Sequence, residues 1–332
     1  MTAVALDVLL DQEDLDQMLR RDVARGLCAT PKELPPKWFY DDRGCKLFDA
    51  ITELPEYYAS RSETEILRAR AARIAEATCA RSLIELGSGS SQKTRILLDA
   101  LTASGKLQQY VSFDIAEPYL RVASEHVAAE YPIEVSGIVG DFEHHAGSLP
   151  DGPNRLIVFL GSTIGNLYPA DRARFFATIA RQMSATDHFL LGADLVKDRR
   201  RLEAAYNDGA GVTAAFNLNL LAVLNRQLDG DFDLDAFEHR AFFDAEHSWI
   251  EMRLRSKRRQ RVTLDAVSIS ASFEEGEEMR TEISQKFTRP TLTAELARAG
   301  LHETAWWTDT RGDYSLSLWS RRPGPDAVLS GT

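Results

Sequence analysis

The sequence has no apolar run long enough to cross a membrane and no excess of positive charge. Its longest apolar runs, such as residues 156–160, have the length of buried strands and fall far short of the ~20 residues that a membrane-spanning helix needs. The 39 Lys and Arg residues are outnumbered by 50 Asp and Glu, which gives a formal net charge of −11. Because phosphate binding needs clustered positive charge, neither a nucleic acid nor an anionic membrane is an expected partner.

The scarcity of cysteine excludes a disulfide framework and favours a cytoplasmic protein. Cys28, Cys45 and Cys79 are odd in number, lie far apart and show no paired spacing, which fits a reducing compartment. The first ten residues are too short, and too acidic in their continuation, for a signal peptide. His144 and His145 are adjacent, but no other ligand recurs at metal-binding spacing, so we expect no metal site. We also expect a monomer.

The most informative short stretch is residues 83–94, where an apolar strand is followed by a glycine turn and a helix. Gly87 and Gly89 stand one residue apart, which lets the backbone approach a ligand where a side chain would collide. A helix is predicted over residues 93–101, and its unpaired N–H groups favour an anionic or polar ligand group. The stretch therefore predicts a cofactor-binding strand–turn–helix.

Strand and helix patterns alternate through residues 61–196, which predicts a parallel sheet covered by helices. Three of the expected strands end in Asp114, Asp141 and Asp194. Ligands bind at the carboxyl ends of such strands, so these acids mark the expected edge of a site. The further strands are predicted at residues 109–114, 133–141, 155–160 and 188–194, and the helices at 118–130 and 169–183.

The remainder of the chain predicts a second domain of α+β architecture, formed by residues 1–60 and 197–286. It contains expected helices at residues 11–26, 45–51, 197–206 and 212–228. A period-two pattern then predicts antiparallel strands at 249–255, 262–264, 267–273 and 279–287. Residues 287–320 return to the first domain with a helix at 291–299 and an antiparallel hairpin, 302–309 with 313–320. Residues 321–332 are expected to be a disordered tail.

Several features favour S-adenosylmethionine over a dinucleotide as the bound cofactor. The turn at Gly87 and Gly89 lacks the third glycine of the dinucleotide fingerprint, which serves close packing beside a pyrophosphate. Asp114 can accept from both ribose hydroxyls, although it would serve NAD equally. Asp141 can accept from the adenine amino group, and Lys93 can meet the methionine carboxylate. The closing hairpin is typical of methyltransferases. We therefore predict an α/β fold with a class I (Rossmann-like) methyltransferase sheet, and we disfavour an NAD-dependent oxidoreductase.

Eight segments support a resemblance to a known family. They are residues 35–41, 54–58, 85–90, 140–142, 159–167, 205–208, 211–217 and 281–287. The most specific are Gly161-Ser162-Thr163-Ile164-Gly165-Asn166-Leu167 and Thr281-Glu282-Ile283-Ser284-Gln285-Lys286-Phe287. With these segments the chain resembles the histidine Nα-methyltransferases of ergothioneine biosynthesis, from residue 31 to the final hairpin. The resemblance implies methyl transfer from S-adenosylmethionine to the α-nitrogen of L-histidine, up to the trimethylated betaine hercynine.

The resemblance also implies a set of site residues. S-adenosylmethionine would be held by Gly87, Lys93, Asp114, Asp141 and Phe142. L-histidine would be held by Tyr57, Asn166, Tyr206, Glu282 and Ser284, with Met252 packed nearby and Tyr40 and Phe48 lining the entrance to the α-amino group. Tyr57, Tyr206 and Asn166 would grip the α-carboxylate and α-amino group, while Glu282 and Ser284 reach the imidazole. Asn166 would orient the amine in catalysis, and Tyr40 would relay its proton through water.

Each of these assignments has a simpler alternative. Asn166 could cap the following helix, and Glu282 and Ser284 could belong to a solvated face of one strand. The aromatic residues of the N-terminal segment could be ordinary packing. At the level of function, the alternatives are methylation of another aromatic amino acid, such as tryptophan, and a protein that binds S-adenosylmethionine without turnover.

Overall fold

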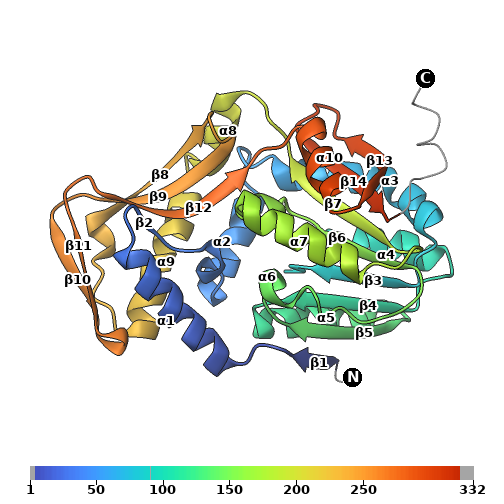
Figure 1. The fold of residues 1–332 in the computed structure, drawn as a ribbon, viewed down its shortest axis with the longest axis horizontal. Helices are drawn as coiled ribbons and strands as arrows, with labels where there is room; N and C mark the ends of the chain where they lie inside the picture. Colours follow the sequence, from blue (N-terminus) through green and yellow to red (C-terminus); the bar gives the residue numbers. More distant parts are fainter. Residues whose placement is uncertain (1–3, 90, 322–332) are drawn as a thin grey trace. The chain divides into compact units, whose positions relative to one another are not determined.

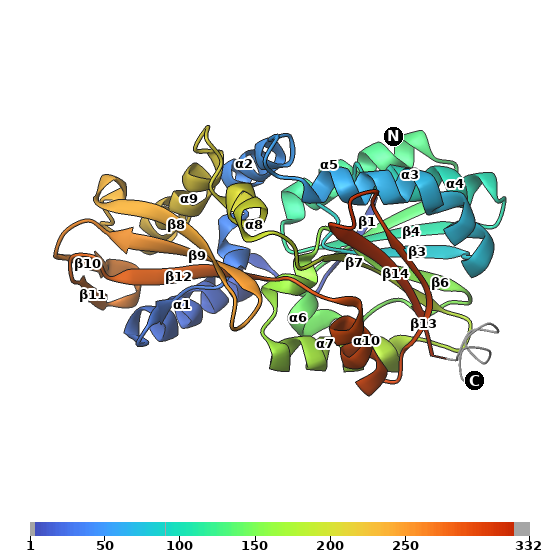
Figure 2. The same cartoon turned by 90° about the horizontal axis from the view of Figure 1, so that it is seen from above.

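The computed structural model describes residues 4–89 and 91–321, which form two compact units (Figures 1 and 2). Among these residues, the first unit takes 4–11, 59–196 and 286–321, and the second takes 12–58 and 197–285. Residues 4–11 therefore group with the predicted methyltransferase domain, whereas the sequence predicts all of residues 1–60 in the other domain. Ser90 of the glycine turn, and the predicted tail from residue 322 onward, lie outside the described residues.

The first unit is built on an eight-stranded sheet of order β1-β5-β4-β3-β6-β7-β14-β13. The first six strands in this order are parallel, while β14 runs antiparallel to both β7 and β13. The strands are β1 (Ala5–Val8), β3 (Ser82–Leu86), β4 (Gln109–Asp114), β5 (Glu134–Val139), β6 (Arg155–Phe159), β7 (His188–Asp194), β13 (His302–Thr308) and β14 (Tyr314–Ser320). This arrangement confirms the predicted class I sheet with its C-terminal hairpin. Strand order reverses beside β3, which lies between β4 and β6, so a ligand crevice is expected at the carboxyl ends of β3 and β6.

Helices cover both faces of this sheet, with α3, α4 and α5 over one and α6, α7 and α10 over the other (Figure 2). Their bounds are α3 (Ala59–Thr78), α4 (Thr94–Ala103), α5 (Glu117–Glu130), α6 (Phe142–His145), α7 (Pro169–Gln182) and α10 (Arg289–Arg298). Strands β3 and β6 are buried along their whole length because they are covered on both faces. Within α3, the buried hydroxyl of Ser62 donates to Asp309 Oδ2 at 3.3 Å.

The second unit contains a four-stranded sheet of order β2-β12-β9-β8 and a separate hairpin, β10-β11. Strands β8, β9 and β12 are antiparallel, and the short β2 pairs parallel with β12. The strands are β2 (Lys32–Glu33), β8 (Phe237–Asp244), β9 (Trp249–Ser256), β10 (Gln260–Leu264), β11 (Ile269–Phe273) and β12 (Glu278–Gln285). The helices are α1 (Gln12–Cys28), α2 (Asp42–Thr52), α8 (Arg199–Tyr206) and α9 (Val212–Leu228).

Gly26 was expected to end the first helix, but α1 continues through it to Cys28. A Cβ atom at Gly26 would lie 1.9 Å from the carbonyl oxygen of Glu33, so glycine is required there for the close approach of β2. In the described ranges, residues 4–89 and 91–321, no helix is long and apolar enough to span a bilayer.

Candidate active site

The glycine turn after β3 is held in place by strand β4. Gly87 and Gly89 both have positive φ, 66° and 49°, in the left-handed region that favours glycine. The amide of Gly87 donates to the carbonyl oxygen of Phe113 at 2.8 Å, and that of Gly89 donates to Asp114 Oδ2 at 2.9 Å. The second carboxylate oxygen, Oδ1, accepts from the amide of Ala116 at 3.1 Å. Asp114 thus shapes the turn, and burial raises the pKa of its carboxyl.

Two observations at this turn fit an adenosyl ligand. Within the described residues, a Cβ atom at Gly89 would meet nothing closer than 4 Å, so space lies beside the backbone. Ser88 is buried, and its hydroxyl has no hydrogen-bond partner in the described part of the chain. A buried polar group without a partner costs free energy, which a ligand hydroxyl or amine can recover.

Lys93 lies just before α4 and its ammonium group donates to the carboxylate of Glu63. Glu63 is fully buried on α3 and also accepts from the amide of Gly161, at 2.9 and 3.1 Å, and from the Tyr314 hydroxyl at 2.7 Å. One carboxylate therefore joins the predicted cofactor lysine to the turn after β6. Sequence reasoning missed Glu63, because these partners lie 30, 98 and 251 positions away and no local pattern marks it.

Glu85, the acid near the end of β3, accepts from the hydroxyls of Thr94 and Tyr110, and Tyr110 also contacts Ser91 at 3.0 Å. Burial raises the pKa of Glu85 from 4.5 to about 7, although both hydroxyls favour its charged form. When Glu85 is protonated it can donate to Tyr110, whose own hydrogen then turns to Ser91. Whether Glu85 is charged or protonated, its hydrogen bonds through Tyr110 to Ser91 link β3, β4 and the glycine turn.

The stability of the protein should fall as the pH rises through this window. Between pH 4.5 and about 7 the folded protein keeps a proton on Glu85 that the unfolded chain has released. By linkage this group alone should lower the free energy of unfolding by on the order of 3 kcal/mol between pH 5 and pH 8. Glu85→Gln removes this titratable group. The difference in free energy of unfolding between the variant and the wild type, measured by chemical denaturation, should therefore shift in favour of the variant from pH 5 to pH 8. A stability difference that does not change with pH would contradict this.

Asp141 and Phe142 follow β5, as predicted, but their contacts are those of a helix start. Asp141 caps α6 by accepting from the amide of Glu143 at 2.9 Å, and its second oxygen contacts His144 Nδ1 at 3.2 Å. The ring of Phe142 packs edge-on against Phe159, with 5.0 Å between centroids. Across residues 4–89 and 91–321, no group of three or more His, Cys, Asp or Glu residues is arranged to hold a metal ion.

Asn166 ends a short 3₁₀ helix, Thr163–Asn166, in the turn after β6. The turn begins with Gly161 and Ser162, both at positive φ, and Ser162 Oγ accepts from the amide of Asp194 at 2.9 Å. The simpler reading, that Asn166 caps the next helix, is wrong because Tyr168 occupies the N-cap position of α7. Asn166 is half-buried at the crevice edge of the sheet.

In the second unit, four predicted substrate residues, three from residues 40–57 and the distant Tyr206, form one aromatic cluster. Tyr40 contacts Phe48 at 5.7 Å between centroids, Phe48 contacts Tyr57 at 6.4 Å, and Tyr57 contacts Tyr206 at 6.3 Å. Tyr206 in turn donates its hydroxyl hydrogen to Ser284 Oγ at 2.8 Å. Phe216 of α9 packs against Tyr40 and Phe48. The cluster therefore runs without a break from Tyr40 to Tyr206 and ends in a polar contact at Ser284.

Glu282, Ser284 and Met252 share one face of the β9–β12 pair. Glu282 lies directly opposite Met252, and Ser284 opposite Ile250, so their side chains point to the same side. A β-bulge between Arg280 and Glu282 produces this, because one extra residue moves the following side chains to the other face. Ser284 is buried and Glu282 half-buried, which does not fit a solvated face.

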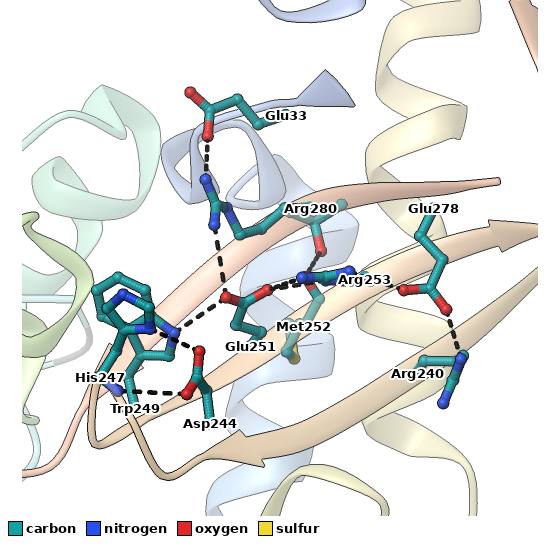
Figure 3. A network of polar contacts seen from close by, with 11 residues as sticks. Glu33, Arg240, Asp244, His247, Trp249, Glu251, Met252, Arg253, Glu278 and Arg280 are labelled. Atoms are coloured by element: carbon teal, nitrogen blue, oxygen red, sulfur yellow. Dashed lines mark hydrogen bonds and ion pairs between the residues drawn. The ribbon is translucent and has the colours of Figure 1, made fainter. Parts of the chain in front are cut away.

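The opposite face of the same strands carries a network of ion pairs with Glu251 at its centre (Figure 3). The buried carboxylate of Glu251 accepts from Trp249 Nε1 at 3.0 Å and from Arg253 Nε at 2.8 Å. Arg280 bridges this carboxylate, at 3.5 Å, to Glu33 of β2, at 2.7 Å. The network ties β2, β9 and β12 together (Figure 3). By the register of the strands it lies on the face opposite Met252 and Glu282.

Comparison with known proteins bears directly on this arrangement. Residues 19–321 match a family described as SAM-dependent, histidine-specific methyltransferases. The chain is 54% identical over 303 residues to a histidine N-alpha-methyltransferase of Mycolicibacterium smegmatis, covering 91% of this chain and 94% of that protein. It is similarly 54% identical over 301 residues to the protein of the same name from Mycobacterium tuberculosis, covering 90% and 94%. It is 29% identical over 310 residues to ergothioneine biosynthesis protein 1 of Neurospora crassa, covering 88% of this chain and 33% of that longer protein.

Proposed function

Because the chain belongs to the family of SAM-dependent, histidine-specific methyltransferases, we propose that it methylates the α-amino nitrogen of L-histidine. The methyl groups are added in succession up to the trimethylated betaine hercynine, as a step of ergothioneine biosynthesis. The observation that carries the proposal within the structure is the grouping of Tyr57, Tyr206 and Ser284. These residues lie far apart in sequence, yet rings and hydroxyls suited to an amino acid meet in one cluster.

We assign Gly87, Lys93, Asp114, Asp141 and Phe142 to the binding of S-adenosylmethionine. The open space beside Gly89 and the buried hydroxyl of Ser88 support this assignment, and Glu63 holds Lys93 at the same edge of the sheet. S-adenosylmethionine supplies an electrophilic methyl group carried on a sulfonium sulfur. The contribution of the chain is to orient the two reactants, which accounts for most of the rate in an in-line displacement.

In the second unit, we assign recognition of the imidazole to Glu282 and Ser284. A carboxylate that accepts from one ring N–H also selects the tautomer in which that nitrogen carries the hydrogen. Met252, directly opposite Glu282, supplies an apolar surface for the ring. Tyr57 and Tyr206 would hold the α-carboxylate through their hydroxyls, which confines the substrate at both ends.

The nucleophile must be the neutral amine, because the ammonium form has no lone pair. An α-amino group has a pKa of about 8 or above, so the site must accept a proton near neutral pH. We assign Asn166 to orient the amine and Tyr40 to relay its proton through water. Each added methyl group brings the product closer to a quaternary cation, and the aromatic faces of Tyr40, Phe48 and Tyr57 are suited to that charge.

The proposal is tested by incubating the protein with isotopically labelled S-adenosylmethionine and each amino acid in turn, with products read by mass spectrometry. Histidine should gain one, two and three methyl groups, and tryptophan should gain none, because an indole offers the Glu282 carboxylate less than an imidazole does. Methylation of tryptophan with histidine inert would favour the alternative substrate. Binding of S-adenosylhomocysteine without any turnover would favour a non-catalytic binding protein. A thermal shift with S-adenosylhomocysteine but not NAD is expected.

We place the reaction in the cytoplasm and expect a monomer. None of the three cysteines, all within the described residues, takes part in a disulfide, which is compatible with a reducing compartment.

A further inference from the structure

A buried asparagine on α9, Asn217, joins two segments that carry the proposed histidine-binding residues. Its amide nitrogen lies 3.1 Å from the carbonyl oxygen of Arg253 and 2.9 Å from His239 Nδ1. Its amide oxygen accepts from the hydroxyl of Thr281 at 2.7 Å. Asn217 and Thr281 are both fully buried, so the hydrogen bond between them forms away from water.

The chemistry of the partners determines which atom donates and which accepts in each of these hydrogen bonds. A backbone carbonyl can only accept, so the Asn217 atom facing Arg253 is its NH₂ group, and the second hydrogen of that group points to His239 Nδ1. Nδ1 is therefore the unprotonated nitrogen of a neutral ring, and Nε2 carries the hydrogen. Nε2 lies 2.8 Å from the carbonyl oxygen of Tyr206, to which it donates. The arrangement is satisfied with a single tautomer and a single amide orientation.

Both ends of this series of hydrogen bonds reach the proposed substrate residues. At one end, the imidazole of His239 holds the main chain of Tyr206, whose hydroxyl bonds Ser284. At the other end, Thr281 is the extra residue of the β-bulge in β12, and its hydroxyl also lies 3.1 Å from the carbonyl oxygen of Met252. That bulge turns Glu282 onto the face of Met252, since without it Glu282 would share the face of Glu278 and Arg280.

We propose that Asn217 and His239 are positioning residues that set Tyr206 and Glu282 at the separation required by histidine. This inference rests on the proposed function and adds to it the origin of the substrate selectivity. Asn217 holds the bulge through Thr281, and His239 carries the same constraint to Tyr206. Neither side chain needs to touch the substrate for its loss to misplace two groups that do.

The test uses two variants of the full-length protein in steady-state kinetics with histidine and S-adenosylmethionine. Thr281→Val removes one hydroxyl without changing the shape of the side chain and should lower kcat/KM for histidine about tenfold, because a buried amide oxygen loses its donor. Asn217→Leu keeps the volume and removes the whole connection, and should lower kcat/KM on the order of 100-fold, mainly through KM for histidine. The affinity for S-adenosylhomocysteine should stay within twofold of the wild type in both.

The matched control is Asn225→Leu on the same helix. Asn225 also makes two hydrogen bonds through its amide, both to the main chain of Phe232 at 2.8 Å, but it touches no substrate segment. It should leave KM for histidine within twofold, even if it lowers stability. If kcat/KM for histidine stays within twofold of the wild type in Thr281→Val, or in an Asn217→Leu variant that folds, the inference is overturned. A wild type that does not methylate histidine would instead overturn the proposed function.

Discussion

Replacing Glu282 with alanine should lower kcat/KM for histidine about 100-fold, since a charge-assisted hydrogen bond lost from a half-buried site costs about 2–3 kcal/mol. The carboxylate is the one acidic group that the bulge in β12 brings to the face of Met252 and Ser284. Without it, an imidazole N–H would enter the site and lose its water without gaining an acceptor. The affinity for S-adenosylhomocysteine should be unchanged, because its proposed residues belong to the other unit.

The measurement is a comparison of kcat/KM for histidine and for tryptophan, together with calorimetric titration of S-adenosylhomocysteine. Glu278→Gln is the matched control, because Glu278 lies on the same strand but bonds Arg253 and Arg240 on the opposite face. It should keep histidine kinetics within threefold. Equal losses of histidine turnover and cofactor affinity in Glu282→Ala would place Glu282 outside the substrate pocket.

Glu63→Gln should weaken binding of S-adenosylhomocysteine about 30-fold, which corresponds to about 2 kcal/mol. The fully buried carboxylate is the shared acceptor for Lys93, the Gly161 amide and the Tyr314 hydroxyl. A neutral amide keeps the volume, but it leaves the lysine without a counter-charge and directs an NH₂ group at groups that also donate. Lys93 and the turn after β6 should both lose their positions.

This prediction is checked by calorimetry with S-adenosylhomocysteine at fixed ionic strength. Glu65→Gln serves as the control on the same helix, because Glu65 is exposed and accepts only from the amide of Thr310 among the hydrogen bonds described. The affinity of Glu65→Gln for S-adenosylhomocysteine should match that of the wild type. If Glu63→Gln folds and binds with wild-type affinity, the carboxylate has no part in positioning the cofactor residues.

Much of the fold could be predicted from the sequence because the central strands are buried on both faces. β3 and β6 read as uninterrupted or nearly uninterrupted apolar runs, and the glycine turn follows β3 directly. Three strands were missed. β2 has only two residues, β1 has four whose side chains are mostly exposed, and β8 is half-buried along most of its length, so none of them shows a period-two pattern.

The site was predictable where it depends on local order along the chain. Asp114 is the last residue of β4, Asn166 lies in the turn after β6, and Glu282 and Ser284 share a face two residues apart. The supporting residues were not predictable in the same way. Glu63 and Asn217 act through partners far away in sequence, and polar residues within helices usually indicate a solvated surface. The bulge at Thr281 is likewise visible only from the register of the paired strands.

The central claim, methylation of the α-nitrogen of histidine, is tested most directly by locating the transferred carbon. The protein is incubated with histidine and S-adenosylmethionine labelled with ¹³C in the methyl group, and the product is examined by long-range ¹H–¹³C NMR correlation. The account predicts that the labelled methyl signals correlate with the α-carbon position and reach three equivalent methyl groups per molecule. Correlation of the label with the imidazole ring positions would contradict it.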